Sequence, residues 1–109
     1  MATLTVQQAV IAGLTPSYGA AAGGGDQFAN SGKAMIHVKN GGGGSINVTV
    51  DSQVACSQGS DHDAVVAVGA GVESMIGPFP KARWNDSSDN VQITYSGVSS
   101  VTIAIVELP

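Results

Sequence analysis

Residues 33–51 read KAMIHVKNGGGGSINVTVD, and this stretch decides the expected fold. On either side of the four glycines at 41–44, apolar residues alternate with polar ones, which is the period of a strand that buries one face. Two such runs joined by a glycine connection are typical of a β-hairpin with a flexible tip. The inward faces are expected to carry Ala34, Ile36 and Val38 from the first strand and Ile46, Val48 and Val50 from the second.

Four more short runs continue this pattern towards the C-terminus. Residues 63–68 and 72–76 are joined by a tight glycine connection, and residues 90–95 and 101–108 by a polar turn. The last run is apolar on both faces near its end, which indicates a strand buried in a sandwich or under a partner. We predict an all-β antiparallel β-sandwich of about seven or eight strands. Strand patterns leave jelly-roll and immunoglobulin-like topology open, because these differ in strand order.

The segment SMIGPFPKARWND at 74–86 gathers two of the four prolines, one of the two phenylalanines and the only tryptophan. Proline donates no ladder hydrogen bond and fixes its own φ, so Pro78 and Pro80 exclude a central strand here. We expect a rigid crossing between the sheets, anchored by Phe79 and Trp84. In the strands that follow, Ile93 and Ile103 are expected core residues.

The first 25 residues give no single pattern. Residues 3–14 alternate at first like a strand and then fit a short helical turn, and we expect an extended stretch with a turn at Gly13. Residues 15–25 are rich in glycine and alanine and are expected to form a loop. We therefore predict that residues 1–25 form a flexible or partner-ordered N-terminal arm, with Phe28 as the first anchor in the core.

Length and composition limit the number of domains and the kinds of partner that the chain can have. A chain of 109 residues is long enough for one core and too short for two, so we predict a single domain over residues 1–109. Charged residues make up 11%, against roughly 25% in ordinary globular proteins, so neutral polar residues or other protein must cover the surface. The net charge of −4, with only four Lys and Arg, argues against nucleic-acid binding, which needs clustered cations.

Hydropathy and the cysteine count indicate where the protein is found and whether it forms a disulfide. The sequence shows no run of about 18 apolar residues and no basic leader, so neither a membrane span nor a secretory signal is expected. We expect a soluble protein made in the cytoplasm of the cell that produces it, with no membrane partner. The single Cys56 excludes a disulfide within the chain, and it is expected to be a small buried residue.

Few residues suggest chemistry. Asp61 and Asp63 flank His62 and could converge on one cation, although a polar turn that caps the next strand is the simpler interpretation. His37 falls on the polar face of its strand, as expected for a solvent or interface histidine. No GxSxG motif occurs, and Ser45 after the glycine run lacks the lysine of a phosphate loop. We predict no enzyme, no cofactor and no metal; an enzyme built on His37 or His62 is the alternative.

Aromatic residues raise a carbohydrate-binding alternative. Trp84, beside Asn85 and Asp86, has residue types that stack on sugars and hold their hydroxyls, and Tyr18 and Tyr95 add further rings. A lone tryptophan in a sandwich is more often a core or interface residue. A carbohydrate-binding adhesion module is therefore the hypothesis from another functional class.

Four motifs follow one another over residues 33–108: HVKNGGGGSINVTVDS, CSQGSDHDAVVAVGAG, ESMIGPFPKARWND and VQITYSGVSSVTIAIVEL. Their order resembles that of small virion proteins of tailed bacteriophages, in which an HVKN-type strand, a glycine turn, an IGPFP crossing and a VQITYS-type strand occur in sequence. The resemblance implies a non-enzymatic β-sandwich structural protein. The closest role is a capsid decoration or cement protein, often a homotrimer, that binds the major capsid protein on the virion surface and reinforces the shell.

In this role, flexible elements and aromatic residues would hold the neighbouring capsomers. The N-terminal arm and the glycine tip at 41–44 would clamp the partner. A head–tail connector or tail structural protein is the alternative virion role, and it differs in copy number per particle. The residues expected to touch a partner are Tyr18, Phe28, Gly42, Gly43, Phe79 and Trp84.

Overall fold

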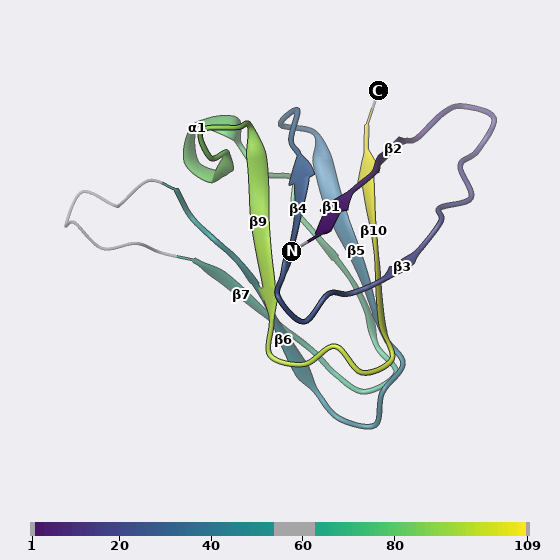
Figure 1. Cartoon of the computed structure of the whole chain (residues 1–109). Coiled ribbons are helices and arrows are strands. Elements are labelled where there is room, and N and C mark those ends of the chain that lie inside the picture. The colour runs from purple at the N-terminus through teal and green to yellow at the C-terminus, as the bar shows by residue number, and fades with distance from the viewer. Residues whose placement is uncertain (1, 54–62, 109) are drawn as a thin grey trace.

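The computed structural model describes residues 2–53 and 63–108. Within these ranges the chain forms ten β-strands and one short helix (Figure 1). The strands are β1 (Ala2–Leu4), β2 (Val6–Gln8), β3 (Gly19–Ala20), β4 (Asp26–Ala29), β5 (Ala34–Asn40), β6 (Ile46–Val50), β7 (Ala64–Val68), β8 (Glu73–Ile76), β9 (Asn90–Tyr95) and β10 (Val101–Glu107), and the helix is α1 (Lys81–Trp84). The prediction of an all-β fold is confirmed.

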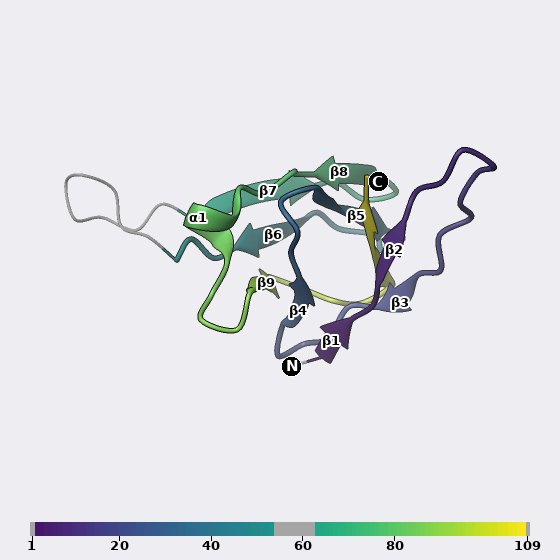
Figure 2. The ribbon, with the colours of Figure 1, turned by 90° about the horizontal axis from the view of Figure 1, so that it is seen from above.

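The strands form two sheets that share one core. Sheet A has the order β1-β4-β9-β6-β7, and sheet B has the order β2-β10-β5-β8, with β3 also paired to β10. The edge strands β7 and β8 contact each other where the two sheets come together (Figure 2). This arrangement is compatible with a β-sandwich.

The sheets are mixed, whereas the sequence pattern predicted a purely antiparallel sandwich. β1 runs parallel to β4, and β2 runs parallel to β10. Parallel neighbours need a long connection between them, and residues 5–25 provide it for β1 and β4. The N-terminal segment therefore adds to the edge of each sheet without forming a hairpin with it.

The core lies between the sheets and contains both predicted isoleucines. Ile93 of sheet A is fully buried, and Ile103 of sheet B is 2% exposed. All three inward residues predicted for β5 are buried, as are Val48 and Val50 of β6, while Ile46 is half-buried. The alternation in the sequence thus predicted the faces of these strands correctly.

The predicted hairpin of residues 33–51 is wrong. β5 belongs to sheet B, where it pairs with β10 and β8, whereas β6 belongs to sheet A, where it pairs with β7 and β9. The connection 41–45 therefore passes the chain from one sheet to the other. Alternation does not distinguish the two cases, because each strand buries one face whether the strands pair or lie on opposite sheets.

Asn40 fixes this crossing at the end of β5. Its side chain is buried, and Nδ2 donates hydrogen bonds to the carbonyls of Gly44, at 2.8 Å, and Val68, at 3.0 Å. Oδ1 accepts from the Gly42 N–H at 3.0 Å, and the Asn40 backbone N–H donates to the Val72 carbonyl. One residue therefore ties the β5–β6 connection to the β7–β8 connection, which also passes between the sheets.

The crossing predicted at 74–86 is confirmed. β8 lies in sheet B and β9 in sheet A, and the connection between them contains α1 and a cis Gly77–Pro78 bond. Phe79 is buried in the core, where its ring lies 6.3 Å from that of Phe28 and 5.5 Å from that of Trp84, centre to centre. Aromatic packing thus anchors the crossing, as expected.

The flexible arm predicted for residues 1–25 is not confirmed. β1 and β2 lie in this segment and pair with sheets A and B, and β3 pairs with β10. The chain passes from one sheet to the other at Thr5, between β1 and β2. Loop 9–18 stands away from the sheets in both views, except at its end, where Tyr18 contacts His37 of β5 (Figure 1, Figure 2).

Candidate functional site

The outer face of sheet B brings together the side chains with the most distinctive chemistry. The alternation along β5 points His37 and Lys39 away from the core. The register places Lys39 opposite Glu73 of β8 and His37 opposite Ala104 of β10. Tyr18, which leads into β3, lies against His37, with the two rings edge to face and 5.3 Å apart.

Tyr18, His37 and Glu73 form a chain of hydrogen-bonding groups. The Tyr18 hydroxyl lies 2.5 Å from His37 Nδ1, and His37 Nε2 lies 3.1 Å from a Glu73 carboxylate oxygen. Lys39 completes the group, because its Nζ lies 4.0 Å from the centre of the Tyr18 ring and 4.0 Å from the same Glu73 oxygen. These four residues are called the outer-face cluster below.

The partners of His37 decide where its proton lies when the imidazole is neutral. A carboxylate only accepts hydrogen bonds, so the proton is on Nε2, facing Glu73. Nδ1 is then the acceptor for the Tyr18 O–H. A carboxylate that orients an imidazole, which in turn accepts from a hydroxyl, is the arrangement that activates hydroxyl nucleophiles.

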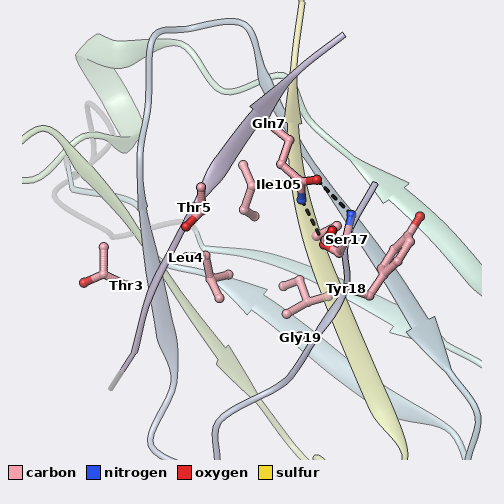
Figure 3. A pocket seen from close by; sticks show the side chains of 10 residues that line it. Thr3, Leu4, Thr5, Gln7, Ser17, Tyr18, Gly19 and Ile105 are labelled. Atoms are coloured by element: carbon pink, nitrogen blue, oxygen red, sulfur yellow. Dashed lines mark hydrogen bonds between the residues drawn. The ribbon is translucent and has the colours of Figure 1, made fainter. Parts of the chain in front are cut away.

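A groove of about 530 Å³ lies beside the cluster (Figure 3). It forms because β2 and β3 share one edge of β10: β2 pairs with residues 105–107 and β3 with residues 102–103, which leaves Ala104 between them. The Gln7 side chain spans this gap. Its amide nitrogen donates to the Ser17 carbonyl at 2.9 Å, and its amide oxygen accepts from the Ser17 N–H at 2.8 Å.

The groove has an apolar side and an uncharged polar side. Its volume falls within the range of small-molecule sites. Tyr18 borders the groove and also belongs to the outer-face cluster, where its hydroxyl contacts His37. The residues that give the lining this character are Leu4, Ile103 and Ile105 on the apolar side and Thr3, Thr5 and Ser17 on the polar side.

Two pKa shifts belong to the fold and lie outside the cluster. Burial, followed by the hydrogen bond to Asp26, raises the pKa of Tyr95 well above its ordinary value of 10. Hydrogen bonds from the Asn90 backbone N–H and the Gln92 side chain lower the pKa of Asp86. Asp86 thus stabilises the turn before β9 in its charged form.

The six residues predicted to touch a partner are spread over the molecule. Phe28 is fully buried and Phe79 is 3% exposed, so both are core residues that offer no surface to a partner in this structure. Gly42 lies in the β5–β6 connection, where an added Cβ would come 3.0 Å from the Ser99 carbonyl oxygen. Gly43 beside it has open space around it.

Tyr18 and Trp84 are both half-buried. Tyr18 belongs to the outer-face cluster. Trp84 ends α1, where the Phe79 ring meets it edge to face and the Arg83 guanidinium carbon lies 5.1 Å from its centre. A sugar that stacked on this indole face would have to displace Arg83.

Of the proposed cation site, Asp61 and His62 lie outside the described residues, as does Cys56. Asp63 is described, and its carboxylate accepts a hydrogen bond from the Ser52 N–H at 2.9 Å. Within residues 2–53 and 63–108, no group of three His, Cys, Asp or Glu side chains is placed to hold a metal ion. In the same part of the chain, no helix is long and apolar enough to span a membrane.

The outer-face cluster was not predicted as a unit from the sequence. The available signal was the alternation that placed His37 and Lys39 on one face. The register that brings Glu73 beside them, and the path that lays Tyr18 over the sheet, come from strand pairing between distant segments. Such pairing leaves no local pattern in the sequence.

Comparisons with known proteins do not identify the chain. No family model, no curated protein and no solved structure matches it.

Proposed function

We propose that the chain is a non-enzymatic structural protein of a tailed-phage virion, a capsid decoration or cement protein that binds the major capsid protein and reinforces the shell. The observation that carries this proposal is loop 9–18, which projects from both sheets ahead of Tyr18 (Figure 1) and turns at Val10, whose carbonyl accepts from the Gly13 N–H. Val10 is 53% exposed and Ile11 is fully exposed. Adjacent exposed apolar side chains on a projecting loop are suited to a contact with another protein.

The charge distribution supports the same role. The first charged residue of the sequence is Asp26, so the whole segment from β1 to β3 is uncharged. Covering an uncharged loop with a partner avoids the cost of removing charges from water. Loop 9–18 is therefore the element that we expect to dock on the capsid.

The motif order over residues 33–108, which resembles that of small phage virion proteins, supports the major capsid protein as the partner. The charged share of 11% suits a surface that is largely covered in an assembled shell. Many copies on a symmetric shell act together, so a small contact per copy suffices. We propose a homotrimer on the capsid surface, as in the group that the motifs resemble.

We infer a jelly-roll-like strand order as the finer description of the fold. In the immunoglobulin sandwich, strands A, B, E and D form one sheet and C, F and G the other, so several successive strands share a sheet. From β4 to β10, successive strands alternate between sheets A and B with one exception, β6 to β7. This alternation supports the jelly-roll type.

Mass spectrometry of purified virions tests the role. We expect the protein at a copy number comparable to that of the major capsid protein. A few copies per particle would instead indicate a connector or tail component, and absence from the particle would overturn the proposal.

Rebinding to particles stripped of the protein tests the docking element. Ile11→Asp places a charge at the loop tip, and we expect it to abolish binding. Val65→Asp is the matched control, because Val65 is 59% exposed on β7, away from the loop. Equal binding by both variants would remove loop 9–18 from the interface.

A further inference from the structure

We propose that Tyr18 is a nucleophilic phenol that accepts an acyl group from an activated carboxylic ester, with His37 as the general base and Glu73 as the residue that positions it. This would be a covalent modification site on the outer face of sheet B. The reactivity of Tyr18 does not depend on the virion role proposed above.

The geometry meets the first requirement of such a site, which is a hydroxyl within hydrogen-bonding reach of a base. The Tyr18 hydroxyl and His37 Nδ1 are 2.5 Å apart. The second requirement is a group that holds the base in the correct tautomer. The Glu73 carboxylate at 3.1 Å from Nε2 does this, because it keeps the proton on Nε2 and Nδ1 free to accept.

The charges around the phenol favour the reaction. Lys39 Nζ lies 4.0 Å from the centre of the Tyr18 ring, so its positive charge stabilises the negative charge that develops on the phenol oxygen. Glu73, on the far side of His37, stabilises the imidazolium once His37 has taken the proton. The titratable and charged groups that face His37 are therefore Tyr18, Glu73 and Lys39.

The groove that adjoins Tyr18 is uncharged. Leu4 is its half-buried apolar side chain, Ile103 and Ile105 behind it are buried in the core, and the lining carries no charged residue. A neutral ester suits this lining better than a phosphate or a carboxylate would. Tyr18 borders the groove, and its hydroxyl points away from the other lining side chains, towards the outer face of sheet B where His37 lies (Figure 3).

The step balances without an oxidant or reductant. The phenol oxygen of Tyr18 forms a bond to the ester carbonyl carbon while its proton passes to His37 Nδ1. The bond between that carbon and the leaving oxygen then breaks, and the proton returns from His37 to the leaving oxygen. The products are O-acyl Tyr18 and the free alcohol or phenol.

Tyr95 is the internal control, because it is the other tyrosine of the chain. Its hydroxyl donates to the Asp26 carboxylate at 2.7 Å on the core side of sheet A. It has no imidazole partner, and burial holds it in its neutral form.

Incubation of the full chain with p-nitrophenyl acetate tests the proposal, with nitrophenol release followed by absorbance and the acetyl group located by tandem mass spectrometry. We expect the acetyl group on Tyr18 and not on Tyr95, whose hydroxyl is buried and bonded to Asp26. Acetylation of both tyrosines at similar rates, or of the lysines alone, would overturn the proposal.

Four variants separate reactivity from folding. His37→Gln keeps a hydrogen-bond acceptor for Tyr18 but cannot take its proton, and we expect the Tyr18 rate to fall about a hundredfold. Glu73→Gln should lower the rate less, because the imidazolium loses its carboxylate, and Glu73→Asp should restore part of the rate; equal rates in Glu73→Gln and the natural chain would remove Glu73 from this role. Tyr18→Phe should lose the adduct while keeping the circular dichroism spectrum. An unchanged Tyr18 rate in His37→Gln would show that His37 is not the base.

Discussion

The two faces of β5 differ in what they do. The inner face carries Ala34, Ile36, Val38 and, at its end, Asn40, and all four are buried. The outer face carries Met35, His37 and Lys39, which are half-buried. One strand of seven residues therefore takes part both in the core and in the outer-face cluster.

The polar residues on the two faces show what the difference means. Asn40 is saturated by backbone groups of two connections, so its hydrogen bonds hold the path of the chain. His37 is bonded to side chains, Tyr18 and Glu73, which can change partners without moving a strand. We infer that the side chains of the inner face stabilise the fold and that those of the outer face carry the proposed reactivity.

Substitutions on the inner, core-facing side of the sheets should have the largest effect on stability. Ile103 lies on β10 opposite Val38 of β5, and Ile93 lies in sheet A. Replacing either one with Ala should lower the free energy of unfolding by about 2 to 5 kcal/mol, because each change leaves a cavity in the core. Met75→Ala is the control on the outer face of β8, where the side chain is 53% exposed. Denaturant melts that give the same stability for all three would contradict the assignment of the faces.

Asn40→Ala should have the next largest effect. It leaves the carbonyls of Gly44 and Val68 and the N–H of Gly42 without their partner, and we expect a loss of about 1 to 3 kcal/mol or somewhat more. Asn47→Ala, at an exposed position of β6, is the matched control. Equal melting temperatures for the two variants would show that the glycine connection holds its path without Asn40.

The difference between local sequence patterns and long-range hydrogen bonds explains how much of the fold was predictable. Alternation gave the faces of β5, β6, β9 and β10, because a period of two residues is a local property. The partner of β5 was predicted wrongly, because the glycines at 41–44 allow either a hairpin or a crossing. The hydrogen bonds of Asn40 to groups on both connections decide between them, and such contacts have no signature in the sequence.

The candidate site was predictable only in fragments, for the same reason. His37 was placed on the polar face of its strand, and Tyr18 was named as a contact residue. Their meeting depends on β3 pairing with β10, and the approach of Glu73 depends on β8 pairing with β5. The composition of the first 25 residues suggested a free arm, because parallel addition to two sheet edges involves no turn signal.

Tyr95→Phe tests a hydroxyl on the core side of sheet A. Asp26 is fully buried, and its Oδ2 accepts hydrogen bonds from the Tyr95 hydroxyl at 2.7 Å and the Ala22 N–H at 3.2 Å. Removing the hydroxyl should cost about 1 to 2 kcal/mol, since a buried carboxylate loses a donor. Tyr18→Phe, on the outer face of sheet B, should cost less. A larger loss for Tyr18→Phe in thermal melts would reverse the roles of the two faces.

The Asp86 carboxylate lies in the turn before β9, on neither face of β5. Its pKa is lowered below the ordinary value of 3.8 in the folded protein, so its charge stabilises the fold above that value, and the stabilisation is lost as the pH falls through the lowered pKa. The difference in melting temperature between the natural chain and Asp86→Asn should therefore be present near pH 6 and shrink towards about pH 2. A difference that stays constant with pH would mean that the hydrogen bonds to Asn90 and Gln92 do not depend on the charge.

Glu73→Gln should have the smallest effect on stability. The Glu73 side chain is 57% exposed, and its contacts with His37 and Lys39 lie at the surface, so we expect a change of less than about 0.5 kcal/mol in denaturant melts. Lys39→Ala, which removes the other charge beside Glu73, is the companion variant and should behave similarly. A loss as large as that of Asn40→Ala would mean that the outer-face cluster holds the sheet together. If Glu73→Gln leaves the stability almost unchanged but slows the acetylation of Tyr18, the Glu73 carboxylate contributes to the reaction and not to the fold.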